Sequence, residues 1–137
     1  MKILIAKTEF FEIYVDQELN RLYLANEGMW QSADALRIYV IEVKDSLSYM
    51  GSGFSLLLDN SHLLPMSQEV QRKIIFPVTA MIQQAGIGKT AVVLPEEDVA
   101  EIMVELNVSR LQKNDKEINS FSTFDEAEFW LDHEITI

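Results

Sequence analysis

The chain has 137 residues, of which 48% are hydrophobic and 24% charged, and its formal net charge is −11. This length and composition predict one ordered globular domain over residues 1–137. A negative surface repels phosphates and anionic headgroups, so nucleic acid and membrane surfaces are not expected as partners. The chain contains no cysteine, which excludes disulfides and thiolate chemistry. No apolar run approaches the ~20 residues of a membrane span, and the first residues lack the apolar core of a leader, so a cytoplasmic location is expected.

The N-terminal part of the chain predicts an antiparallel hairpin. Residues 10–16 and 21–26 are rich in Ile, Tyr, Val and Leu, and a short polar link joins them. In the second segment Leu22, Leu24 and Asn26 fall on one face. Residues 1–8 form either an edge strand or a lead-in.

The next segment predicts a helix followed by a buried strand. Ser32 is a good N-cap, and Gly51 ends the helix. Its apolar stripe consists of Leu36, Val40, Val43, Leu47 and Met50. Residues 53–58 are then almost entirely apolar, which predicts a central strand covered by helices, with Leu57 fully buried and a turn from Asp59 onward.

A second helix and another strand are predicted beyond that turn. Ser67 caps the helix and Gly86 closes it. Pro77 lies inside, where it removes a backbone donor, so we expect one bent helix and not two separate helices. Residues 89–94 predict a second buried strand, parallel to the first and stopped by Pro95.

The C-terminal part predicts a third helix, a short strand and a final helix. The third helix begins with acidic residues, and its predicted apolar stripe is Val99, Ile102, Met103 and Leu106. Whether residues 107–117 extend this helix or form a loop stays open. Residues 117–121 read as a strand, and Thr123 with Glu126 forms a capping box. The final helix has an apolar face of Phe124, Ala127, Trp130 and Leu131.

The predicted elements give a mixed α/β sheet, with an N-terminal antiparallel hairpin followed by parallel strands that helices connect. The hairpin, the central Leu-Leu-Leu-Asp-Asn-Ser, the proline-bearing helix and the closing Asp-Glu-Ala-Glu-Phe-Trp-Leu together resemble the STAS, or SpoIIAA-like, family. That resemblance implies the SpoIIAA-like fold and a non-enzymatic module that docks onto proteins, in some members under control of serine phosphorylation. The family's Asp-x-Ser matches Asp59 and Ser61. Its Asp-Ser pair is missing around Ser67, so the phosphorylation switch is not carried over.

Two functions are therefore predicted. The favoured one is a non-enzymatic regulatory or protein-interaction module, with a protein partner, no cofactor, no metal and no catalytic residue, and with a homodimer left open. Its candidate docking residues are Asp59, Asn60, Ser61, His62, Leu64 and Ser67. The alternative is a small-ligand or metal-dependent enzyme that uses the acidic strand-end edge, where open α/β sheets bind ligands. Its candidate residues are Asp59, His62, Glu96, Glu97 and Asp98.

Two apparent motifs have simpler explanations. Gly86-Ile87-Gly88-Lys89-Thr90 ends like a phosphate-binding loop, but Gln83 stands where the first glycine is required. The order is also helix, loop, strand, so a helix stop and turn is expected. Trp30 and Trp130 are expected to pack in or near the core, with partner contact as the alternative.

Overall fold

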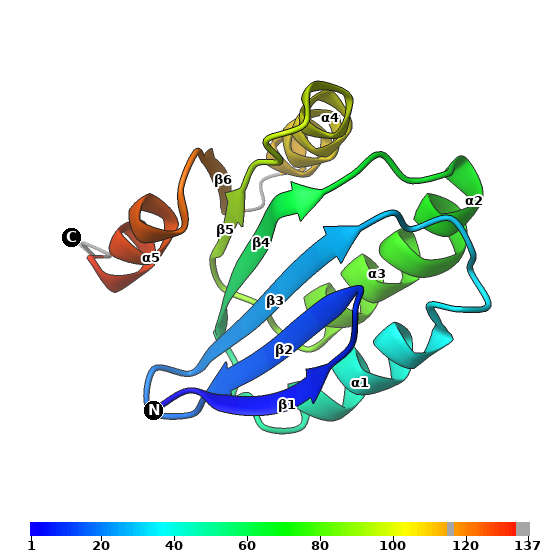
Figure 1. Cartoon of the computed structure of the whole chain (residues 1–137). Helices are drawn as coiled ribbons and strands as arrows, with labels where there is room; N and C mark the ends of the chain where they lie inside the picture. Colours follow the sequence, from blue (N-terminus) through cyan, green and yellow to red (C-terminus); the bar gives the residue numbers. More distant parts are fainter. Residues whose placement is uncertain (115–116, 134–137) are drawn as a thin grey trace.

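The computed structural model describes residues 1–114 and 117–133, which form a mixed α/β fold around one sheet (Figure 1). The strands are β1 (Ile3–Lys7), β2 (Phe11–Asp16), β3 (Arg21–Gly28), β4 (Ser55–Leu63), β5 (Thr90–Val93) and β6 (Ile118–Phe121). The helices are α1 (Arg37–Leu47), α2 (Gln68–Val70), η1 (Gln71–Ile75), α3 (Phe76–Gln84), α4 (Asp98–Lys113) and α5 (Phe124–Asp132).

The strands lie side by side in sequence order, from β1 at one edge to β6 at the other. Strands β1, β2 and β3 pair antiparallel, and β3, β4, β5 and β6 pair parallel. The predicted mixed sheet, with its N-terminal hairpin and helix-linked parallel strands, is confirmed. Residues 3–7 form the edge strand that the sequence left open.

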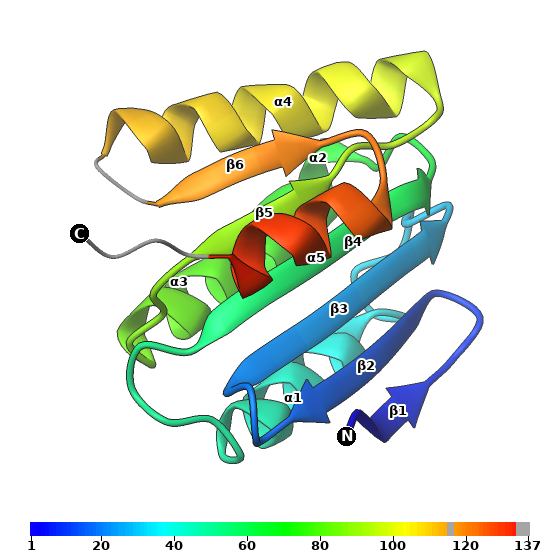
Figure 2. The ribbon, with the colours of Figure 1, turned by 90° about the vertical axis from the view of Figure 1, so that its left-hand side faces the viewer.

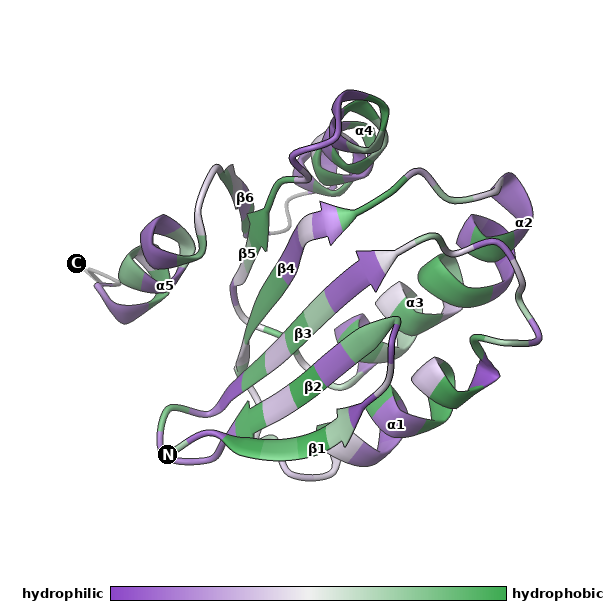
Figure 3. Ribbon diagram, viewed as in Figure 1, coloured by the Kyte–Doolittle hydropathy of each residue, from purple (hydrophilic) through white to green (hydrophobic). Residues whose placement is uncertain are grey.

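Helices cover the two faces of the sheet unequally. Helices α1, α3 and α4 share the larger core with one face, while α5 packs on the opposite face (Figures 1 and 2). Hydrophobic and hydrophilic residues alternate along β2 and β3, as expected of strands with one thoroughly covered face (Figure 3). In the larger core the Tyr39 ring meets Phe11 and Trp30 edge-on, with centroids 5.0 and 4.8 Å apart. Trp30 is fully buried, so it is a core residue.

Helix α5 closes the smaller core on the other face. Leu57, predicted to be buried, is 1% exposed there and packs with Ala127 and Leu131. The predicted cap is also present, because Thr123 Oγ1 accepts from Glu126 N at 3.2 Å and its hydroxyl donates to Glu126 Oε1 at 3.0 Å.

The segment from residue 68 to residue 84 is one continuous helical stretch, as predicted. Its irregularity is a π-helical turn, η1, in which Phe76 N–H donates to Gln71 C=O five residues earlier. Pro77 follows directly within this continuous stretch, where the π-helical turn leaves room for its ring beside the preceding carbonyl groups. The wide turn therefore accommodates the proline.

Two predicted boundaries were wrong. Ser32 does not cap α1, which starts at Arg37; its Oγ instead accepts from Ala35 N at 3.3 Å in a preceding turn. Asp59 does not begin a turn, because β4 continues to Leu63 through a register irregularity opposite Ala25 and Glu27. A local turn signal was overridden by pairing with the neighbouring strand β3.

Helix α4 runs to Lys113, which settles its end in favour of helix, while residues 115 and 116 lie outside the described residues. Its predicted apolar stripe was wrong except for Met103, which packs against the core. The buried face is Ala100, Val104 and Val108. Val99, Ile102 and Leu106 are 59%, 58% and 67% exposed. Both faces are apolar in sequence, and the one with the smaller side chains packs on the sheet.

The loop before β5 explains the glycines that resemble a phosphate-binding motif. A Cβ at Gly88 would lie 2.8 Å from the carbonyl oxygen of Gly53, closer than real contacts allow. Gly88 N–H also donates to Phe54 C=O at 2.7 Å. Glycine is therefore required there for a close approach of two backbones.

Candidate ligand-binding cavity

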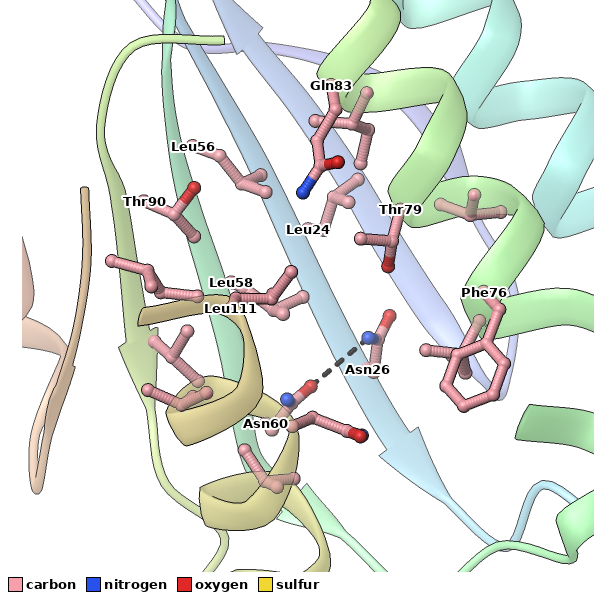
Figure 4. Close-up of a pocket in the computed structure, with 18 of the residues that line it drawn as sticks. Leu24, Asn26, Leu56, Leu58, Asn60, Phe76, Thr79, Gln83, Thr90 and Leu111 are labelled. Atoms are coloured by element: carbon pink, nitrogen blue, oxygen red, sulfur yellow. Dashed lines mark hydrogen bonds between the residues drawn. The ribbon is translucent and has the colours of Figure 1, made fainter. Parts of the chain in front are cut away.

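A cavity of about 440 Å³ lies between the sheet and the helices α3 and α4 (Figure 4). Helix α4 packs along β6 and α3 packs beside α1, so the sheet face between them is only partly covered. The inward side chains of the central strands form its floor, among them Leu24, Leu56, Leu58 and Val92. The volume lies within the range of small-molecule sites, and most of the lining is apolar, as in such sites.

Two asparagines interrupt this apolar floor. Asn26 on β3 and Asn60 on β4 are 3% and 4% exposed, and both line the cavity. Asn26 Nδ2 donates to Asn60 Oδ1 at 3.1 Å, which joins the two parallel strands (Figure 4). Each asparagine continues the inward alternation of its strand, after Leu22 and Leu24 on β3 and after Leu56 and Leu58 on β4.

The side-chain oxygen of Asn26, Oδ1, takes no part in this asparagine pair. Asn26 Oδ1 is buried and has no hydrogen-bond partner among residues 1–114 and 117–133. Leaving such a group unpaired costs ~1–3 kcal/mol, and proteins rarely do so without a reason. The cavity therefore presents a buried acceptor that a donor could satisfy.

Tyr39 supports the polar end of the floor from α1. Burial raises the pKa of its hydroxyl well above the ordinary value, and a hydrogen bond from Asn26 acts in the opposite direction. The phenol is therefore uncharged at neutral pH. Its ring packs edge-on against Phe11 and Trp30.

Polar and charged side chains gather at the walls and mouth. Thr79 and Gln83 reach toward the cavity from α3 (Figure 4). Arg110 of α4 lies over the Phe76 ring at 4.9 Å and donates to Asn107 Oδ1 at 2.7 Å. Among the described residues that line the cavity, only Arg110 and Glu117 are charged, and both are exposed.

The docking residues predicted from sequence are separated by the structure. Asn60 points into the cavity, whereas Asp59 accepts from Ser61 N at 3.0 Å. Ser61 Oγ lies 3.2 Å from Nδ1 of the exposed His62. Leu64 is 36% exposed, and Ser67 Oγ caps α2 by accepting from Val70 N at 3.1 Å. Whether these residues contact a partner stays a prediction.

One carboxylate of the acidic edge proposed for the alternative function has a structural role. The carboxylate of Glu97 caps α4 by accepting from Val99 N and Ala100 N at 3.1 and 2.7 Å. Glu96 N–H donates to Ser61 C=O at 3.0 Å. Within the described ranges, no three His, Asp or Glu side chains lie close enough together to hold a metal ion.

The cavity was not predicted from the sequence, although the sequence contains a pattern that could have indicated it. Leu22, Leu24 and Asn26 were placed on one face, and that face is buried as expected. An asparagine on the apolar face of each of two neighbouring strands is a buried polar pair, and such pairs are informative because they are costly.

Comparison of the chain with protein-family models, with curated proteins and with solved structures gives no match. The described part of the chain also contains no helix that is long and apolar enough to cross a membrane. The geometry of the cavity is therefore the main evidence for what the chain does.

Proposed function

We propose that this chain is a non-enzymatic regulatory module of the STAS-like kind that binds a small organic molecule in the cavity between β3, β4 and β5 and the helices α3 and α4. The observation that carries the proposal is the unpaired, buried Asn26 Oδ1 in a mainly apolar cavity of about 440 Å³. The sequence resemblance to STAS domains supports a regulatory role, and the lining residues within 1–114 and 117–133 bring together no acid, base and nucleophile for catalysis.

A cavity-blocking variant tests this function. Thr79→Phe places a ring where Thr79 now lines the cavity, and Ala80→Phe adds the same ring at the exposed neighbouring position of α3. Small uncharged compounds are screened by thermal melting against both variants and the parent protein. A ligand present at 100 times its dissociation constant stabilises the folded state by about 2.7 kcal/mol.

The expected result is a set of compounds that raise the melting midpoint of the parent protein and of Ala80→Phe but not of Thr79→Phe. Compounds that stabilise all three proteins equally bind elsewhere. If no compound distinguishes Thr79→Phe from the other two proteins, the cavity is not a binding site and the proposal fails.

A specific observation supports a protein partner as well. Val99, Ile102 and Leu106 form a continuous exposed apolar stripe on α4, next to the cavity-lining Met103. Exposed apolar residues are common singly, whereas a contiguous stripe marks an interaction surface. Asp98, Glu101 and Glu105 flank the stripe on the same helix. We infer a partner surface that combines apolar and basic side chains.

The docking surface is tested by adding charge to the stripe. The double variant Ile102→Glu with Leu106→Glu should lose a protein that the parent chain captures from native cells, without a large change in melting midpoint. The control is Ile41→Glu on α1, because Ile41 is equally exposed at 60%. If the control and the double variant reduce capture equally, the partner does not dock through α4. Because the inferred partner surface is basic, added salt should weaken capture, and capture that salt leaves unchanged would also contradict the proposal.

A further inference from the structure

We propose that the ligand of the cavity is an uncharged, elongated and mainly apolar molecule that carries a hydroxyl or N–H group bonded to Asn26 Oδ1. This inference rests on the proposed function and adds the chemical class of the ligand. It stands on three observations: the orphan acceptor, the absence of charge on the buried lining among the described residues, and the course of the cavity along β4.

The first observation requires a donor. The Nδ2 group of Asn26 is already used, because it donates to Asn60 Oδ1 at 3.1 Å. Its Oδ1 is the unpaired end, and an amide oxygen only accepts hydrogen bonds. An ether or a carboxylate offers only acceptors, so neither can satisfy it. A hydroxyl, an amide N–H or an amine N–H can.

The second observation requires an uncharged ligand. The floor around Asn26 consists of asparagine, tyrosine and aliphatic side chains, and the described charged lining residues, Arg110 and Glu117, are exposed at the rim. An ion placed at the floor would lose its hydration without gaining a counter-charge, and that cost is prohibitive. Ammonium and carboxylate compounds are therefore excluded from this position.

The third observation concerns shape. Successive inward residues of one strand, Leu56, Leu58 and Asn60, all line the cavity. At ~3.3 Å per residue they span ~13 Å along β4. The buried acceptor lies at the Asn60 end, the floor between Asn60 and Leu56 is aliphatic, and Gln83 and Thr90 lie beside Leu56 (Figure 4). A ligand with one donor and an aliphatic body matches this order. A single water on Asn26 Oδ1 would leave the apolar length unfilled.

Four probes of matched size separate these requirements. They are 1-octanol, its isomer methyl heptyl ether, octanoate and octylammonium. Binding is measured by methyl NMR titration, with Met66 and Met103 as reporters because both line the cavity. The expected order is 1-octanol first, the ether about tenfold weaker because the acceptor remains unpaired, and the two ions weaker still.

The double variant Asn26→Leu with Asn60→Leu is decisive. It replaces the Asn26 acceptor with an apolar group of similar size, and it also removes Asn60 Oδ1, which would otherwise lose its donor Asn26 Nδ2 and become a new unpaired acceptor. In this variant the alcohol and the ether should bind within about twofold of each other. The control Asn119→Leu makes an Asn-to-Leu change at an exposed position of β6 and should keep the tenfold preference. If the double variant fails to fold, the preference in the parent protein still decides the question.

Each result has one meaning. Equal binding of alcohol and ether by the parent protein overturns the donor requirement and leaves the proposed function intact. Tightest binding of octanoate or octylammonium overturns the neutral class. Retention of the tenfold preference in the double variant Asn26→Leu with Asn60→Leu shows that another residue takes the donor and overturns the role of Asn26. If none of the four probes perturbs Met66 or Met103, both this inference and the proposed function fail.

Discussion

Arg21 at the start of β3 donates from Nη1 to Asp132 Oδ1 at the end of α5, across 2.8 Å. The arginine side chain is only 4% exposed, and its Nε also donates to Ser55 Oγ at 3.1 Å. Burial opposes the charge, but hydrogen bonds to Tyr23 and Asp132 outweigh it, so the pKa of Arg21 is raised. This ion pair joins α5 to β3 on the sheet face opposite the cavity.

The two partners of this ion pair should respond unequally to mutation. Arg21→Ala removes buried hydrogen bonds to β4 and α5 together, so it should lower the free energy of unfolding by ~2–4 kcal/mol. Asp132→Ala should cost only ~1 kcal/mol, because the buried Arg21 guanidinium keeps Glu128 as a counter-charge at 3.8 Å and keeps its hydrogen bonds to Ser55 and Tyr23. Urea unfolding of both variants checks this difference. Equal losses would show that Asp132 accounts for the whole contribution of Arg21.

Tyr23 should make the protein sensitive to alkaline pH. Burial first, and then its 2.7 Å hydrogen bond to Glu128, raise the pKa of its hydroxyl to about 12. The unfolded chain has the ordinary value of ~10, so the folded state holds this proton more tightly. The contribution to stability is complete below pH ~10 and is lost as the pH rises toward 12.

The measurement is the free energy of unfolding between about pH 9 and 11. It should fall more steeply with pH in the parent protein than in Tyr23→Phe, which lacks the titrating hydroxyl. Other buried groups, Tyr39 among them, affect both proteins alike. Parallel curves for the two proteins would contradict the raised pKa of Tyr23.

Leu57 tests the smaller core. Because it is 1% exposed beneath α5, Leu57→Ala should cost ~2–5 kcal/mol through lost transfer energy and a new cavity. Leu19→Ala, at a position that is 50% exposed, makes the matched change with little effect. A loss below ~1 kcal/mol for Leu57→Ala would mean that α5 does not cover β4.

Pro77 tests the π-helical turn. Pro77→Ala restores a backbone donor at an exposed position in the first turn of α3, so it should be neutral or stabilise by less than ~1 kcal/mol. Comparison of melting midpoints decides this. A large fall would show that the proline holds a strained geometry that alanine cannot keep.

The hairpin and the central strand were predictable because their signals were local and unambiguous. Residues 53–58 offered no polar face, so burial was the consistent assignment. Helix α4 was different, since Val99, Ile102 and Leu106 compete with Ala100, Val104 and Val108 at the same helical spacing. Periodicity cannot rank two apolar faces. Packing against β6 selected the face with the smaller side chains.

The cavity could not be predicted from periodicity at all. Its existence depends on the separation of α3 and α4, which follows from how each helix packs on the sheet and not from any motif. Asn26 and Asn60 are 34 residues apart, so their pairing depends on the register of β3 against β4. The turn chemistry of Asp59-Asn60-Ser61 also misled, because it suggested a surface loop where Asn60 is 4% exposed.

A crystal structure of the protein with bound 1-octanol would locate the ligand in the cavity. We expect the hydroxyl oxygen about 2.7–3.0 Å from Asn26 Oδ1 and the alkyl chain running along Leu56 and Leu58 toward the far end of the cavity. Density for the alcohol outside the cavity, or an alkyl chain at Asn26 with the hydroxyl at the rim, would contradict this expectation.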